Sequence, residues 1–203
     1  MSIVTSKIYK GVLQMRFMKT RLAIIIAFLL SLISISSVLS AAPFDYKYYE
    51  KEAATKQESL SQFTTKFNKN SKARTHNMKL CSMAIDNYVL NPGEVFSFNE
   101  VVGYAGPQQG YQKAVIFVDG KEEKAYGGGI CQVSSTLYNA AMEAKLEIVE
   151  RHPHSKPVGY VPEGKDAATS YNGVDLKFKN THSFPVTINS YISDNSYTVE
   201  ILK

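Results

Sequence analysis

Apolar side chains recur along the chain with two different spacings, which predict two main helices and several short strands. Residues 74–88 place apolar side chains every three or four positions, and residues 131–144 do the same. Strand-like or extended patterns cover residues 63–67, 95–98, 114–118, 124–126, 146–150, 158–163, 174–178, 185–191 and 197–202. We therefore predict an α+β fold, with a mostly antiparallel sheet and two main helices.

The start of the second helix carries the most informative residues. Three glycines, Gly127, Gly128 and Gly129, precede Cys131, and a hairpin signal at residues 119–120 leads into them. Glycine permits positive φ and close approach of another molecule. Cys131 is therefore predicted at the N-terminus of a buried helix, near the edge of a sheet. Unpaired backbone N–H groups and the helix dipole would stabilise a thiolate there.

Two other readings of Cys131 have to be set beside the catalytic one. A free cysteine is among the most buried residue types and commonly serves packing. Cys131 could also form a disulfide with Cys81, the second cysteine of the chain, which would rule out a nucleophilic thiol. Cys81 falls within the first predicted helix, where it has the pattern of a small core residue.

The N-terminal region has the composition of a targeting segment. Five of the 23 basic residues fall in residues 1–42, which lack Asp and Glu, and an apolar stretch covers residues 22–39. Small residues follow at Ser40, Ala41 and Ala42, as at a signal-peptidase site. We predict a signal peptide or an uncleaved membrane anchor over residues 1–42.

The charge distribution and the apolar segment set the expected location and partners. The rest of the chain has 18 basic and 18 acidic residues, so the net charge of +5 gives no indication of nucleic-acid binding. Residues 43–62 are predicted to be a linker and residues 63–203 the domain. The domain is expected outside the cytoplasm, secreted or anchored to the outer face of the membrane. Membrane association is expected through the N-terminal segment alone.

A cysteine nucleophile needs a base, usually histidine, and a group that orients it. His152 and His154 follow a predicted strand and would point to opposite faces, so at most one faces Cys131. Asp166 and Asp175 are both candidates to orient that histidine. The alternative for each histidine is a structural role. His-x-His without a further ligand at suitable spacing argues against a metal site, and we predict neither metal nor cofactor.

Other candidate groups lie close to Cys131 in the sequence. Backbone N–H groups from Gly129 to Gln132 could form an oxyanion hole, and the glycine loop could contact substrate. Ser134 and Ser135 are alternative nucleophiles only in principle, because they fall inside the helix rather than at its exposed first residue. We include them with Gln132 among the candidate substrate-binding residues.

Several motifs together resemble the VanW family. The core block is Gly127-Gly128-Gly129-Ile130-Cys131-Gln132-Val133-Ser134-Ser135-Thr136-Leu137-Tyr138-Asn139. Flanking blocks are Asn91 to Asn99, Gly110-Tyr111 with Ala114-Val115, and His154-Ser155 followed by Tyr160-Val161-Pro162, Gly164 and Asp166-Ala167. The resemblance covers roughly residues 63–190. The family is named after an accessory protein of glycopeptide-resistance gene clusters, and some members are described as L,D-transpeptidases.

The resemblance implies an enzyme of the cell wall that forms 3–3 cross-links between peptidoglycan stem peptides. Cys131 would attack the donor peptide, His154 would be preferred over His152 as the base, and Tyr160 joins the candidate substrate-binding residues. Two alternatives stay open. One is a non-catalytic module that binds peptidoglycan or a glycopeptide through backbone amides. The other is a cysteine peptidase or L,D-carboxypeptidase that cuts stem peptides.

Overall fold

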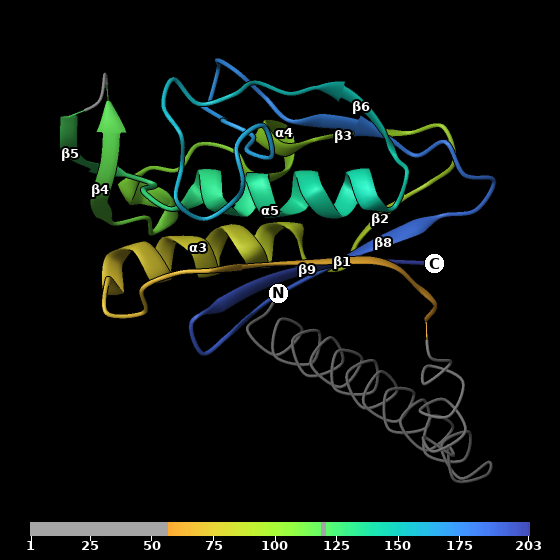
Figure 1. Ribbon diagram of the computed structural model, residues 1–203, viewed down its shortest axis with the longest axis horizontal. Helices are drawn as coiled ribbons and strands as arrows, with labels where there is room; N and C mark the ends of the chain where they lie inside the picture. Colours follow the sequence, from red (N-terminus) through yellow and green to blue (C-terminus); the bar gives the residue numbers. More distant parts are fainter. Residues whose placement is uncertain (1–56, 119–120) are drawn as a thin grey trace, which may run out of the picture. The chain divides into compact units, whose positions relative to one another are not determined.

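The computed structural model describes residues 57–118 and 121–203 (Figure 1). The predicted targeting segment, residues 1–42, and residues 43–56 of the predicted linker lie outside these residues. In the described ranges, no helix is long and apolar enough to cross a membrane.

The largest sheet has four antiparallel strands in the order β1-β9-β8-β2. Its strands are β1 (Ser59–Lys66), β2 (Tyr88–Leu90), β8 (Val186–Ser193) and β9 (Ser196–Leu202). β8 and β9 form a hairpin, and β1 pairs with β9, which places Phe63 opposite Val199. The first and last strands of the domain are therefore neighbours, with β1 at one edge of the sheet.

Two helices of 14 residues each cover one face of this sheet. They are α3 (Lys72–Ile85) and α5 (Ile130–Glu143), which contact each other (Figure 1). α5 packs on β1 and β9, and α3 packs on β8. A second antiparallel sheet, β3-β7-β6, borders α5: β3 is Val95–Ser97, β6 is Glu147–Glu150 and β7 is Lys177–Lys179. α5 thus lies between two sheets, which explains why it is buried on several sides.

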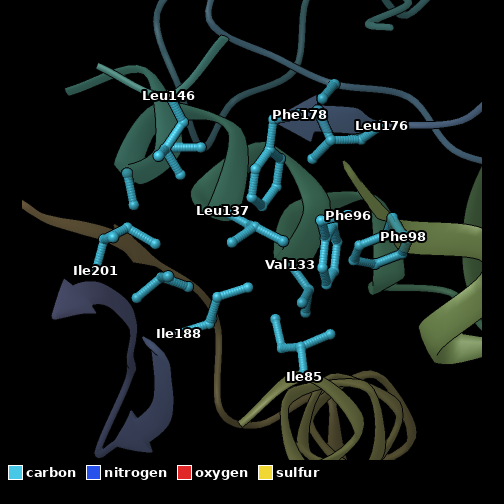
Figure 2. Close-up of a cluster of buried hydrophobic side chains, with 14 of the residues drawn as sticks. Ile85, Phe96, Phe98, Val133, Leu137, Leu146, Leu176, Phe178, Ile188 and Ile201 are labelled. Atoms are coloured by element: carbon cyan, nitrogen blue, oxygen red, sulfur yellow. The ribbon is translucent and has the colours of Figure 1, made fainter. Parts of the chain in front are cut away.

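The core fills the space between these layers. Figure 2 shows Val133 and Leu137 of α5 between Ile188 and Ile201 of the large sheet and Phe178 of the small sheet. These five side chains are fully buried. Apolar burial on both sides of α5 supplies the main stabilisation of the domain, and it fixes the helix that carries Cys131.

The remaining elements lead the chain to the start of α5. α4 (Phe98–Val102) and a 3-10 turn (Pro107–Gln109) precede the hairpin of β4 (Lys113–Val118) and β5 (Lys121–Tyr126). The hairpin is the one that the sequence predicts, and it leads through the glycines into α5.

The α+β prediction with two main helices is confirmed, while several details differ. The described strands form three antiparallel sheets rather than one. Residues 158–163, expected to be extended, contain turns, and β7 begins only at Lys177. β1 begins at Ser59, so residues 59–62 belong to the sheet rather than to a linker. Strand β1 pairs along its length with β9. The local sequence of residues 59–62 is mostly polar and did not indicate a strand, because the strand depends on this long-range pairing.

Candidate active site around Cys131

Cys131 is the second residue of α5 and is half-buried. Its neighbours Ile130 and Gln132 donate their N–H groups to the carbonyls of Gly127 and Gly129, at 3.1 Å in both cases. The N–H of Cys131 has no acceptor within the described residues. One backbone donor at the positive end of α5 is therefore free beside the sulfur, as an oxyanion site requires.

Packing explains the glycines that precede Cys131. A Cβ on Gly128 would lie 2.9 Å from the backbone oxygen of Val115, and one on Gly129 would lie 3.2 Å from that of Arg74. Gly129 also has φ +112, a conformation that side chains rarely adopt. Gly128 and Gly129 are buried against β4 and α3, and their contact with substrate stays a prediction. Gly127 is half-buried, and its contact with substrate stays a prediction.

His154 is held by Asp166. The Asp166 Oδ2 atom accepts from His154 Nδ1 and from the His154 backbone N–H, both at 2.6 Å. The other carboxylate oxygen accepts from Arg151 at 2.7 Å, and the Asp166 carbonyl accepts from Arg151 Nε at 2.6 Å. A carboxylate on Nδ1 fixes the tautomer and leaves Nε2 as the second ring nitrogen, the one available to Cys131.

The pKa values of Cys131 and His154 shift in opposite directions. Burial raises the pKa of the Cys131 thiol, but hydrogen bonds with His154 and Thr169 and the charge of His154 together outweigh it, so that the pKa is lowered. The hydrogen bond with Cys131 raises the pKa of His154 against the effect of burial, and Asp166 raises it further. Both shifts favour a thiolate beside an imidazolium.

Thr169 is a further neighbour of the sulfur. Its carbonyl oxygen accepts from the Cys131 thiol at 3.5 Å, and its hydroxyl oxygen is buried with no hydrogen-bond partner within the described residues. Hydrogen bonds with Thr169 also lower the pKa of Cys131. A carbonyl can only accept, so it favours the neutral thiol, whereas the hydroxyl can donate to a thiolate. The lowering therefore comes first from the backbone N–H of Thr169 and second from its hydroxyl, since both can donate to a thiolate.

Ser134 and Ser135 hold the segment that carries Asp166. The Ser134 hydroxyl donates to the carbonyl of Ala167 at 2.7 Å, and the Ser135 hydroxyl accepts from the Ala167 N–H at 2.9 Å. Both serines are fully buried. This segment encloses their hydroxyl groups in the second turn of α5, and their contact with substrate stays a prediction.

Gln132 is also occupied by the protein. Its Oε1 atom accepts from Arg74 at 2.7 Å, and its Nε2 atom donates to Thr65 and to the Lys66 carbonyl at 3.0 Å each. The residue is 1% exposed, and its contact with substrate stays a prediction. It links the start of α5 to α3 and β1 instead.

Tyr160 and Arg74 complete the surroundings of Cys131. The Tyr160 ring lies edge-on to the His154 ring, with centroids 6.5 Å apart. Burial, followed by the nearby Cys131, raises the pKa of Tyr160, and a positive charge on Arg74 lowers it. Tyr160 is half-buried, as is Arg74, which extends from α3. The predicted substrate contact of Tyr160 is compatible with this placement.

The other candidates lie elsewhere. His152 Nε2 contacts Glu150 Oε1 at 3.1 Å, and Asp175 accepts from the Ser97 hydroxyl at 2.6 Å and the Asn99 N–H at 2.9 Å. The structure thus brings His154 and Asp166 to Cys131, and not His152 or Asp175. His76 and His182 bond to backbone oxygens of Gly110 and Ala144, which are structural contacts. Cys81 and Cys131 are both free thiols.

A cleft of about 310 Å³ lies beside His154 and Asp166. Its lining includes Arg151, His154, Lys156, Glu163 and Asp166. The described residues contain no group of three or more His, Cys, Asp or Glu side chains arranged to hold a metal ion. The site described above brings together a thiol, an imidazole and a carboxylate.

Comparison with known proteins identifies the family. The family model described as "VanW like protein" matches residues 73–202. The chain belongs to the VanW family. The VanW match includes Arg74, Cys131, His154, Asp166 and Thr169, so the whole candidate site lies in the VanW domain.

Two curated relatives resemble parts of this VanW chain. It is 49% identical over 129 residues to the uncharacterized protein YoaR of Bacillus subtilis (strain 168), which covers 64% of this chain and 43% of YoaR. It is 30% identical over 112 residues to the vancomycin B-type resistance protein VanW of Enterococcus faecalis (strain ATCC 700802 / V583), covering 53% and 41% of the two chains. The chain thus spans about two fifths of the length of these relatives. No solved structure matches.

Sequence reasoning missed three residues of the VanW site: Arg74, Arg151 and Thr169. Arg151 precedes His152 in the sequence, and this position next to the candidate histidines could have indicated that it belongs to the site. Arg74 and Thr169 carry no such signal, because only the packing of α3 and of the Asp166 segment against α5 brings them to the sulfur.

Proposed function

We propose that this protein is a cysteine acyltransferase of the bacterial cell wall, an L,D-transpeptidase that joins peptidoglycan stem peptides by 3–3 cross-links. The observation that carries the proposal is the contact of Asp166 with His154 Nδ1 at 2.6 Å, beside a Cys131 thiol whose pKa His154 lowers. A nucleophile, a base and an orienting group in this order are the arrangement of covalent acyl transfer.

In the first half of the proposed reaction, the Cys131 thiolate attacks the carbonyl carbon of the L,D peptide bond of a donor tetrapeptide. The carbonyl oxygen becomes an oxyanion, which the free N–H of Cys131 stabilises. The C–N bond then breaks, and the His154 imidazolium gives its proton to the departing amine of D-alanine. The donor is left as a thioester on Cys131.

In the second half, the side-chain amine of a diamino acid on an acceptor stem attacks the thioester carbon. Neutral His154 takes a proton from this amine, the C–S bond breaks and the thiolate is regenerated. Asp166 keeps the imidazole in place through both halves and stabilises its charged form. Water as the acceptor would give a carboxypeptidase from the same residues.

The proposed setting is the outer side of the cytoplasmic membrane. Its support is the composition of residues 1–42 and the family relative named for vancomycin resistance. Stem peptides of peptidoglycan are then the proposed partners, and binding of nucleic acid is not part of the proposal.

The test is incubation of the full chain with purified disaccharide-tetrapeptide, followed by mass spectrometry. We expect a dimer that has lost one D-alanine, absent with Cys131→Ala and retained with Cys81→Ala, which removes the other thiol. Tripeptide alone would replace the proposal with a carboxypeptidase. Unchanged substrate with folded protein would contradict the enzyme and favour the binding module.

A further inference from the structure

Arg74 differs from the other half-buried charged residues near Cys131 in its hydrogen-bond partners. In the described part of the chain, its guanidinium has no carboxylate partner, and its side-chain hydrogen bond goes to the neutral Gln132 Oε1 at 2.7 Å. Arg151, by contrast, makes two hydrogen bonds to Asp166. A guanidinium has five N–H donors, and burial without an anion is unfavourable, so Arg74 has unused donors for an anionic ligand.

Arg74 lies close to the start of α5, where Cys131 is located. Its Cγ atom lies 3.0 Å from where a Gly129 Cβ would be, two residues before Cys131, and its guanidinium reaches the residue that follows Cys131. The N-terminus of α5, with the free N–H of Cys131, lies at the same place. Arg74 therefore adds a full positive charge to the positive end of this helix.

We propose that Arg74 binds the C-terminal carboxylate of a peptide whose last bond lies at Cys131. This carboxylate belongs to the residue that leaves, one residue beyond the attacked carbonyl. An arginine fork matches the two oxygens of a carboxylate, and the pair is stronger than a neutral hydrogen bond. The site would then accept the free end of a peptide and reject an internal bond.

The inference rests on the proposed function for the identity of the peptide, while the carboxylate subsite itself needs no turnover. Burial lowers the pKa of Arg74, and the nearby Tyr160 and Cys131 act against this lowering. A bound carboxylate would remain beside the thiolate only if a cation offsets the repulsion, and Arg74 is in place to do so.

The test compares a stem tetrapeptide that has a free C-terminal carboxylate with the same peptide as its C-terminal amide. Binding of both is measured by calorimetry to the full chain carrying Cys131→Ala, which cannot turn the peptide over. We expect the acid to bind about 10- to 150-fold more tightly than the amide, the range of a hydrogen bond to a charged group. If the chain with Arg74 intact binds the acid and the amide equally tightly, the inference is overturned, and no Arg74 variant is needed for this result.

Variants of Arg74 then test whether Arg74 causes the tighter binding of the acid. In the Cys131→Ala background, Arg74→Gln should remove the preference for the acid and Arg74→Lys should keep part of it. Lys79→Gln, an exposed charge of the same helix, should leave it unchanged. A preference for the acid that survives Arg74→Gln in folded protein would also overturn the inference. If Arg74→Gln does not fold, the Arg74→Lys variant and the acid–amide comparison decide.

Turnover separates this inference from the proposed function. In the Cys131-containing chain, Arg74→Gln should raise KM for the acid far more than it lowers kcat. Turnover of the acid and the amide at equal KM would support the proposed enzyme activity and contradict the carboxylate subsite. Arg74-dependent binding of the acid without any turnover would support the carboxylate subsite and contradict the proposed enzyme activity.

Discussion

Asp166 holds His154 by two hydrogen bonds to a single oxygen, because Oδ2 accepts from both the ring Nδ1 and the backbone N–H of His154 at 2.6 Å. Arg151 occupies the other oxygen, and Ser134 and Ser135 hold the neighbouring Ala167 against α5. The histidine is therefore positioned by the same helix that carries Cys131, through the segment packed on it.

Asp166→Asn should impair catalysis much more than folding. The amide can keep a hydrogen bond to the backbone of His154, but it cannot stabilise an imidazolium and it can favour the wrong tautomer. We expect kcat for the tetrapeptide to fall by about 10²–10⁴, the usual contribution of acid–base catalysis. Asp194→Asn, in the exposed turn between β8 and β9, is the matched control and should keep wild-type kcat. An Asp166→Asn variant with unchanged kcat would exclude Asp166 from the mechanism.

The ion pair of Cys131 and His154 predicts a shifted pH dependence. The lowered pKa of Cys131 means that thiolate persists below the ordinary thiol range of about 8.5. The raised pKa of His154 means that imidazolium persists above about 6.5. Activity should therefore rise with pH through the lowered thiol pKa, and fall as pH rises through the raised imidazole pKa.

The rate of alkylation by iodoacetamide, measured against pH in a Cys81→Ala background, gives the Cys131 pKa directly. His154→Ala should raise this pKa, because the hydrogen bond and the positive charge are both lost. His152→Ala should leave it unchanged, since His152 contacts Glu150 instead. An alkylation pKa at or above the ordinary thiol value in the wild-type site would contradict the ion pair.

Thr169→Val should separate function from stability. Its buried hydroxyl has no partner among the described residues, so the isosteric methyl group should leave the free energy of unfolding within about 0.5 kcal/mol or increase it. The Cys131 pKa should rise only slightly, because the larger contribution of Thr169 comes from its backbone and remains in the variant. Thr169→Ser keeps the hydroxyl and should keep the low pKa. A large loss of stability in Thr169→Val, measured by urea unfolding, would show that the hydroxyl is bonded after all.

Gly128→Ala and Gly129→Ala should destabilise the domain. The new Cβ would lie 2.9 Å from the backbone oxygen of Val115 in the first case, and 3.2 Å from that of Arg74, at φ +112, in the second. Strain at such positions costs about 1–3 kcal/mol, so the free energy of unfolding should fall by that amount. Gly159→Ala is the control, because nothing lies within 4 Å of its Cβ position, and its stability should be unchanged. Wild-type stability of Gly128→Ala would contradict the close packing on β4.

Much of the fold and one position of the site could be predicted from the sequence. The β4–β5 hairpin follows from Asp119-Gly120 between alternating strands, and α5 follows from its apolar spacing. These are local signals, since turn chemistry and periodicity act within a few residues. They place Cys131 at the start of a buried helix, and the structure confirms that position.

The partners of Cys131 could not be chosen in the same way. Local sequence offers both His152 and His154, and both Asp166 and Asp175. Which of them reach the sulfur depends on how the segment after β6 folds back over α5, and that path is fixed by the contacts of the two buried serines with Ala167. The same serines were expected to contact substrate, because a sequence shows polarity but not what encloses it.

The sequence by itself therefore determined the α+β class, the two main helices and the helix-terminal place of Cys131, each through short-range spacing. Only the tertiary structure decided that His154 and Asp166 lie beside that cysteine, that Gln132 faces inward, and that Arg74 extends from α3 without an anionic partner. The physical reason is that these relationships join segments dozens of residues apart. Chain packing, rather than local preference, sets the distance between them.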